Sequence, residues 1–303
     1  LEIGSNDGVH LQFYKKVGIQ VLGIDPAENI AKVANEKGIR TIAEFFSLNL
    51  AKKFRSEGIQ ADLVYGANVF AHVPEIVGFV KGVKLILSEK GTAVFEFPYL
   101  RGLFENKFDT IYHEHVFYYS LLSVTYLFKK VDLEIYDVEF IPMQGGSLRI
   151  FVAHLNVYKI SPHATRLIRK EREEGFDKIE VYKKIGENVK ELKEAIVDLL
   201  TKFKREGKTI AAYGTPAKGN VLLNYFGISK YLDFIVDKSP SKQGLYTPGT
   251  HMLVYPPSKI WDKKPDYLFL LSWNIADEVI SEFVAYTKQG GKFIIPIPKL
   301  LIL

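Results

Sequence analysis

Short apolar runs alternate with amphipathic stretches along the first hundred residues. Each apolar run predicts a strand, at 1–4, 19–25, about 39–43, 61–68 and 92–98. The gaps between these runs carry helical patterns, at 9–18, 26–37, about 47–57 and about 74–89. Strands and helices that alternate at this spacing predict a parallel sheet with helices on both of its faces.

The pattern changes after residue 100. The segments 131–138 and 147–154 are β-prone and joined by a short link, so we expect them to close the sheet as an antiparallel edge. Residues 162–206 are highly charged and keep an apolar residue every three or four positions. This period predicts a long, largely exposed helix or helix pair that connects two domains.

A second alternation of strands and helices begins at residue 208. Strands are predicted at 208–214, 232–237, 265–273 and 290–298, helices at 216–227 and 274–288, and a Pro/Gly-rich loop at 239–257. The predicted fold class is therefore α/β, with a Rossmann-like sheet followed by a second, smaller Rossmann-like domain. We place the domains at 1–157 and 207–303, with 158–206 as a helical connector.

Composition narrows the class of protein. The chain has 303 residues, enough for two domains, and no apolar run approaches the roughly 18–20 residues that span a membrane. Without a signal-peptide pattern, we expect a cytoplasmic protein. Cysteine is absent, which excludes a disulfide framework and thiolate metal sites within this sequence. The sequence starts inside a predicted strand and without Met, so we expect a piece of a longer chain.

The formal net charge of +5 suits an anionic small ligand. Lys and Arg are scattered among acidic residues, with no basic tract that is interleaved with aromatic side chains. Nucleic acid is therefore the weaker interpretation. The oligomeric state cannot be predicted from these patterns.

The glycine-rich turn after the first strand, GSNDG, predicts a ligand held by the backbone. Gly4 and Gly8 permit a close approach, and Asp25 ends the next strand about 20 residues later, where an acidic residue takes ribose hydroxyls. The spacing is not the G-x-G-x-x-G that receives a pyrophosphate, and Asp7 makes the turn acidic. These features favour a cationic nucleoside, S-adenosylmethionine, over NAD. Alternatively, this is an ordinary turn and Asp25 only caps the next helix.

The segment IYHEHVFYYS, at 111–120, concentrates acid–base side chains. Two imidazoles, a carboxylate and several phenols could supply the base and the enolate donor that methylation of a carbon next to a ketone requires. The alternation of side chains does not by itself identify the base. A metal site at His113 and His115 is an alternative, but no third ligand is evident nearby and we predict no metal.

Seven stretches of the sequence, in this order, resemble the family of nucleotide-sugar C-methyltransferases. They are EIGSNDG, GIDPAENIA, ANVFAHVPE, YHEHVFYYS, QGGSLR, AYGTPAKGNVLLNYFGI and VDKSPSKQGLYTPGTH. The resemblance runs over nearly the whole chain. It implies a class I methyltransferase domain that binds S-adenosylmethionine, followed by a Rossmann-like domain that closes over the nucleotide sugar. The family's usual N-terminal domain, with clustered cysteines and zinc, is missing from this sequence, so zinc is expected only in that domain.

The resemblance assigns His115 as the general base, with Tyr112 and Glu114 assisting and His72 as a donor from the opposite wall. His72 could instead be a buried histidine that fixes a turn. We expect the cofactor to be held by Glu2, Gly4, Asn6, Gly8, Asp25, Pro26, Phe45 and Asn68. Phe45, or its neighbour Phe46, would cover the adenine, although a core role is an equal alternative.

A second strand-to-helix turn, YGTPAKGN, places Lys218 near a helix N-terminus, where an anion such as a sugar diphosphate binds well. We expect the substrate to be held by Arg149, Tyr213, Lys218, Asn220 and Lys242. Lys218 could instead be a solvated surface lysine, and Arg149 could form a structural salt bridge.

The predicted function is therefore methyl transfer from S-adenosylmethionine to a carbon of a nucleotide-linked 4-keto-deoxysugar, through an enolate. The resemblance points to position 3 of the sugar. One alternative is an O- or N-methyltransferase that acts on another phosphorylated molecule. A second is a non-catalytic module that binds nucleotide sugars, and an NAD dehydrogenase is the weakest alternative.

Overall fold

The computed structural model describes residues 1–142 and 145–303. The chain forms two compact units, which we describe separately: Leu1–Leu100 with Glu114–Lys178, and Arg101–His113 with Ile179–Leu303. The expected connector 158–206 is thus divided, because its first helix packs against a strand of the first unit. The functional domain limits at 157 and 207 stay a prediction.

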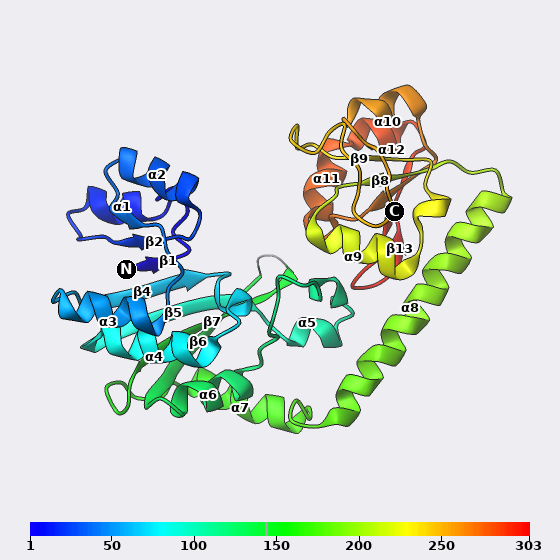
Figure 1. Ribbon diagram of the computed structural model, residues 1–303. Helices are drawn as coiled ribbons and strands as arrows, with labels where there is room; N and C mark the ends of the chain where they lie inside the picture. Colours follow the sequence, from blue (N-terminus) through cyan, green and yellow to red (C-terminus); the bar gives the residue numbers. More distant parts are fainter. Residues whose placement is uncertain (143–144) are drawn as a thin grey trace. The chain divides into compact units, whose positions relative to one another are not determined.

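The first unit is built on a seven-stranded sheet with the order β3-β2-β1-β4-β5-β7-β6 (Figure 1). Strands β1 to β5 run parallel to one another, and β7 is antiparallel to both β5 and β6. This confirms the expected parallel sheet with an antiparallel edge. The strands are β1 (Glu2–Ile3), β2 (Gly23–Ile24), β3 (Thr41–Ile42), β4 (Ala61–Ala67), β5 (Leu87–Pro98), β6 (Leu133–Ile141) and β7 (Ser147–His154).

Helices cover this sheet, and α3 and α4 pack side by side (Figure 1). The helices of the first unit are α1 (Leu11–Lys16), α2 (Glu28–Glu36), α3 (Leu48–Ser56), α4 (Ile76–Ile86), α6 (Leu121–Lys129) and α7 (Pro162–Glu173). A short 3₁₀ helix, η1 (Phe70–His72), follows β4. The fully buried Phe70 ring packs against the rings of Phe79, Phe95 and Phe128, and so joins η1 to α4, β5 and α6. Such aromatic packing fixes the place of η1 beside the sheet.

The second unit contains a six-stranded sheet with the order β10-β9-β8-β11-β12-β13. Every pair of neighbours is parallel except β12 and β13. This arrangement confirms the expected second Rossmann-like sheet. The strands are β8 (Ile210–Tyr213), β9 (Phe234–Val236), β10 (Val254–Tyr255), β11 (Tyr267–Leu270), β12 (Lys292–Ile295) and β13 (Leu301–Ile302).

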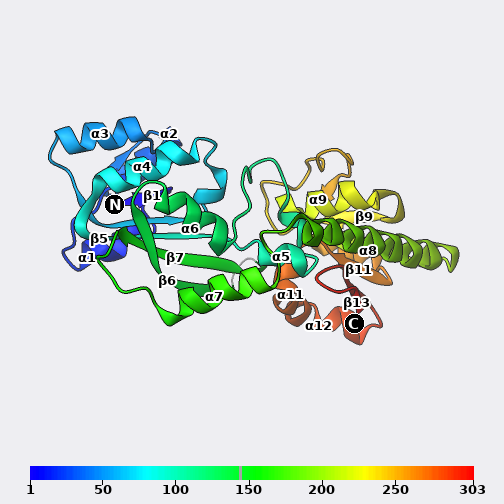
Figure 2. The ribbon, with the colours of Figure 1, turned by 90° about the horizontal axis from the view of Figure 1, so that it is seen from below.

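The longest helix of the second unit is α8 (Ile179–Arg205), one uninterrupted rod (Figure 2). Its predicted apolar period is confirmed by the buried side chains of Ile185, Val189, Ile196 and Leu200. The other helices are α5 (Arg101–Phe104), α9 (Ala217–Phe226), α10 (Ser258–Lys263), α11 (Ala276–Glu282) and α12 (Val284–Lys288). The prediction of a single helix at 274–288 is therefore wrong, because α11 and α12 are separated at Phe283. Among the described helices, none is long and apolar enough to cross a membrane.

Candidate active site

A cavity of about 410 Å³ lies at the carboxyl ends of β1 and β4. The chain leaves β1 toward β2 on one side, while β4 pairs with β1 on the other, so this is the point at which the strand order reverses. Ligands of open α/β sheets bind at such points. Five predicted site residues line the cavity: Gly4, Pro26, Phe45, Asn68 and His72.

The turn after β1 requires glycine at its first position. Gly4 has a φ of +73°, and a Cβ atom there would lie 2.5 Å from a methyl carbon of Val69, which also lines the cavity. Gly8 serves a different purpose, because a Cβ atom there would meet Ile39 in the small core of α1 and α2. Gly4 therefore contributes backbone to the cavity wall, whereas Gly8 packs against the core, and the predicted approach of a ligand to either glycine stays a prediction.

Asp25 braces this turn. Its carboxylate accepts a hydrogen bond from the backbone N–H of Asn6 at 2.9 Å and another from that of Ala27 at 3.0 Å, just before α2. The alternative role of Asp25, a cap for the following helix, is not observed, because Ala27 is the N-cap of α2 and the Asp25 carboxylate accepts the N–H of Ala27 itself, not one from the first turn of the helix. The carboxylate is buried and does not line the cavity, although its neighbours Ile24 and Pro26 do. A contact between Asp25 and ribose stays a prediction, as does the role of Asn6.

The two phenylalanines after β3 have different environments. Phe46 is buried and packs edge-on against Phe79 at a centroid distance of 5.2 Å, so it belongs to the core, although it also lines the cavity. Phe45 lines the cavity with 79% of its surface exposed. Its ring is therefore available to cover a flat ligand group.

Asn68 supplies an acceptor to the cavity wall. Its backbone adopts a left-handed φ of +55°, and its N–H donates to the carbonyl of Glu96 at 2.8 Å. The side-chain Oδ1 atom is buried and has no hydrogen-bond partner among the described residues. An acceptor in this state fits a ligand that brings its own N–H or O–H donor.

Two imidazoles meet beside the cavity. The ring centroids of His72 and His115 are 4.9 Å apart and their planes are inclined by 67°. His115 is buried, and the next residue, Val116, donates its N–H to the carbonyl of Ala71 at 2.9 Å. The structure therefore brings the predicted base and the predicted second donor together in one unit.

The other two predicted catalytic residues have different surroundings. Glu114 belongs to the first unit and is exposed, whereas Tyr112 belongs to the second unit and is half-buried. Among the described residues, no group of three or more His, Asp or Glu side chains could hold a metal ion.

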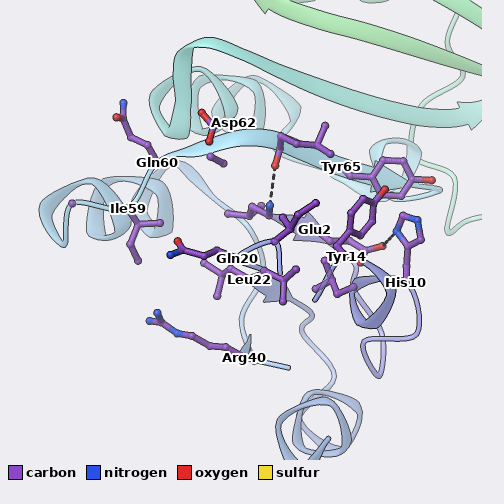
Figure 3. A pocket seen from close by; sticks show the side chains of 17 residues that line it. Glu2, His10, Tyr14, Gln20, Leu22, Arg40, Ile59, Gln60, Asp62 and Tyr65 are labelled. Atoms are coloured by element: carbon purple, nitrogen blue, oxygen red, sulfur yellow. Dashed lines mark hydrogen bonds and ion pairs between the residues drawn. The ribbon is translucent and has the colours of Figure 1, made fainter. Parts of the chain in front are cut away.

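Glu2 lines a different cavity, of about 430 Å³, at the amino ends of the same strands (Figure 3). One oxygen of Glu2 lies 3.2 Å from Nδ1 of His10, and burial raises the pKa of Glu2 above its ordinary value. Figure 3 shows the two side chains pointing toward each other, with Tyr14 and Tyr65 nearby. The Glu2 carboxylate therefore lines a different cavity from the one that Gly4 and Asn68 line. A contact between Glu2 and the cofactor stays a prediction.

At the end of β8, the second unit contains the same kind of carboxylate-centred turn that Asp25 forms in the first unit. The backbone N–H and the hydroxyl of Thr215 both donate to Oδ2 of Asp237 at 2.7 Å, and Ser239 donates its N–H to Oδ1 at 2.8 Å. Lys242 donates to the same Oδ2 at 3.3 Å. The predicted contact of Lys242 with an anion would therefore compete with this ion pair.

A buried polar cluster, not predicted from the sequence, lies beside Lys218. Asp109, in the 3₁₀ helix η2 (Phe108–Thr110), is fully buried and accepts a hydrogen bond from the indole N–H of Trp273 at 2.6 Å. Burial raises the pKa of Asp109 and lowers that of Lys218, and the two charges partly oppose these shifts. Lys218 is half-buried, so its alternative role as a solvated surface lysine is wrong.

The remaining predicted substrate residues differ in their surroundings. Tyr213 is buried and packs edge-on against Phe283 in an apolar core. Asn220 has a buried Oδ1 atom without a partner among the described residues. Arg149 pairs with Glu96 and Glu139, each at 2.9 Å, which is the structural alternative that the sequence left open. Gln144, which begins the QGGSLR stretch, lies outside the described residues.

Comparison with known proteins identifies both halves of the chain. A methyltransferase domain family matches residues 1–138, and a family described as the C-methyltransferase C-terminal domain matches residues 142–298. C-methyltransferase NovU of Streptomyces niveus is 35% identical over 302 residues, which cover 99% of this chain and 72% of NovU.

Similar solved structures include the plantazolicin methyltransferase BpumL, at 14% identity and a TM-score of 0.41, over 50% of this chain and 75% of that one. Magnesium protoporphyrin IX methyltransferase from Synechocystis PCC 6803 is 13% identical with a TM-score of 0.38, over 50% of this chain and 68% of that one. Our assignment rests on the two family matches and on NovU. The chain therefore belongs to the C-methyltransferase family of S-adenosylmethionine-dependent methyltransferases.

Proposed function

We propose that this C-methyltransferase methylates C-3 of a nucleotide-linked 4-keto-deoxysugar. The observation that carries the proposal is the pair of imidazoles, His72 and His115, beside the cavity at the ends of β1 and β4. A carbon becomes nucleophilic when a base removes a proton next to a ketone, and a buried imidazole beside a second imidazole is suited to this task.

The cavity fits S-adenosylmethionine in charge and in shape. Among the described residues that line it, Glu44 and Glu75 are acidic and none is Lys or Arg, which favours a cationic ligand over a diphosphate. Phe45 would cover the adenine, and the unpartnered Oδ1 of Asn68 would accept a hydrogen bond from the ligand. When bound, the cofactor supplies an electrophilic methyl group on a sulfonium.

In the proposed reaction, His115 takes the proton from C-3 of the sugar, and the electron pair of that C–H bond forms the enolate of the C-4 ketone. A hydrogen bond from His72 would stabilise the developing negative charge on the oxygen. The enolate carbon then forms a bond to the methyl group as the bond from methyl to sulfur breaks. His115 later releases its proton to solvent, which restores the free base.

We assign the nucleotide part of the substrate to the second unit. The start of α9 offers backbone N–H groups together with Lys218 and the unpartnered acceptor of Asn220. An anion would offset the burial cost of the Lys218 ammonium group. The contacts of Tyr112, Tyr213, Arg149 and Lys242 with the substrate belong to the same proposal.

The test is methylation of a thymidine-diphosphate-linked 4-keto-deoxysugar with cofactor that carries ¹³C in its methyl group. We expect NMR to show the label bonded to carbon at C-3, and no product from the matching 4-hydroxy sugar, which cannot form an enolate. A label on oxygen or nitrogen would replace the proposal with an O- or N-methyltransferase. Label at another carbon would retain carbon transfer but reject C-3.

A further inference from the structure

We propose that Glu171, on α7, is a positioning residue for residues 115–120, which we call the base segment because it starts at His115. The inference rests on the proposed role of His115 as the base. Glu171 itself lies in the range that the sequence marked as an exposed connector, and its side chain has no exposed surface. A charged side chain is rarely buried completely without specific partners.

The carboxylate of Glu171 has three donors, each at 2.7 Å. One oxygen accepts the hydroxyl of Tyr99 and the backbone N–H of Leu121, and the other accepts the N–H of Leu122. The two N–H groups belong to the first turn of α6, where backbone donors lack partners within the helix. Glu171 thus fixes the helix that begins immediately after the base segment.

Further hydrogen bonds continue along the base segment toward His115. Tyr119 offers its carbonyl to the N–H of Leu100 at 2.9 Å, next to Tyr99, and its hydroxyl lies 3.4 Å from the carbonyl of Phe70. Val116 donates to the carbonyl of Ala71 at 2.9 Å. The segment is therefore fixed against η1 at its start and against Glu171 at its end, and η1 carries His72.

The chemistry of Glu171 suits this role better than that of a neutral side chain. A carboxylate accepts on both oxygens, and hydrogen bonds to a charged acceptor are shorter and stronger than neutral ones. Burial raises the pKa of Glu171, while the bonds from Leu122, Tyr99 and Leu121 oppose the rise. In Glu171→Gln, one of the two oxygens becomes an NH₂ group, which would face a backbone or hydroxyl donor and push the end of the base segment away.

The test compares Glu171→Gln with Glu173→Gln, an exposed glutamate on the same helix whose partner is Arg169 at 3.6 Å. We expect Glu171→Gln to lower kcat about 10- to 100-fold, because small misplacements of a catalytic group have effects of this size. The affinity for S-adenosylhomocysteine should stay unchanged, since the cavity is lined by other elements. Hydrogen exchange should become faster at residues 116–122, and Glu173→Gln should match the unchanged protein.

Three results would overturn the proposal. The first is an unchanged kcat in folded Glu171→Gln, and the second is unchanged hydrogen exchange at residues 116–122. The third is a loss of affinity for S-adenosylhomocysteine as large as the loss of kcat, which would mark a general structural effect. If Glu171→Gln does not fold, Tyr99→Phe removes one donor only and should give a smaller change of the same kind. Its failure to do so would also reject the proposal. His115→Ala separates the two hypotheses: unchanged activity of that variant would reject His115 as the base, whereas faster exchange at 116–122 in Glu171→Gln depends only on the hydrogen bonds that Glu171 accepts.

Discussion

Asp25 and Asp237 perform the same task at the strand ends of the two units. Each carboxylate accepts a hydrogen bond from a backbone N–H in the glycine turn that follows the neighbouring strand. Each also accepts one from the backbone N–H of the residue two positions after the aspartate. The position of Asp25 could be predicted, because an acidic residue at a strand end is a local signal. Asp109 and Glu171 could not, since Trp273 lies 164 residues from Asp109 and Tyr99 lies 72 residues from Glu171.

Asp109 should make stability depend on pH. Burial raises its pKa above the ordinary value of 3.8, and the hydrogen bond from Trp273 partly opposes this rise. The native state therefore binds the proton more tightly than the unfolded state, so this contribution to stability is complete below pH 3.8 and is lost as pH rises through the native pKa. Asp109→Asn keeps an acceptor for Trp273 and cannot ionise.

Thermal melts between about pH 4 and pH 7 test this sign. The melting temperature of Asp109→Asn, relative to the unchanged protein, should increase as pH rises. Asp262→Asn, at an exposed position in the same unit, should show no such trend. A relative melting temperature of Asp109→Asn that falls with rising pH would contradict the assigned direction of the pKa shift.

At the scale of elements, local periodicity predicted the long helix α8 and the closing strands β6 and β7. It did not predict α6, because the sequence LLSVTYLFK is apolar on most sides and rich in aromatic and branched residues. The reciprocal hydrogen bonds of Ser120 and Ser123 mark its start, but serines three residues apart are a weak signal. Strand β10 has two residues inside a Pro/Gly-rich loop, and such short pairing depends on its neighbour β9.

The turn between β1 and α1 gives a prediction about cofactor affinity. Gly4→Ala adds a Cβ atom that Val69 must move to accommodate, and Val69 lines the cavity. We expect about a tenfold weaker Kd for S-adenosylhomocysteine, which corresponds to about 1.4 kcal/mol. Calorimetric titration would measure it.

Gly58→Ala is the matched control for this change. Gly58 has a similar φ of +77°, but no heavy atom lies within 4 Å of the added Cβ position. Both variants should lose roughly 1–2 kcal/mol of stability through backbone strain. Only Gly4→Ala should lose cofactor affinity, and an unchanged Kd in that variant would show that the turn does not shape the cofactor site.

At the scale of the whole molecule, the strand–helix alternation predicted both sheets and the antiparallel edge of the first. It did not predict that residues 101–113 join the second unit or that α7 joins the first. These memberships depend on contacts between distant parts of the sequence, such as the Phe108 ring against Tyr225 and Phe226 of α9. The amino-acid pattern around Phe108 contains no local sign of this packing.

Ligand binding should stabilise the native protein by mass action. At a free concentration 100 times its Kd, S-adenosylhomocysteine should add about 2.7 kcal/mol to the free energy of unfolding, and NAD should add nothing. Phe45→Ala should reduce this stabilisation at a fixed ligand concentration. Phe13→Ala, an exposed ring on α1 outside the cavity, should not. Stabilisation by NAD alone would contradict the assigned cofactor.

The most direct test of the account is exchange of the sugar's C-3 proton into deuterated water, with S-adenosylhomocysteine in place of the methyl donor. We expect the protein to catalyse this exchange, His115→Ala to slow it at least about 100-fold, and the exposed control His163→Ala to leave it unchanged. Exchange by His115→Ala at the full rate would show that another group is the base. Methyl transfer without any detectable exchange in the unchanged protein would contradict the enolate route itself.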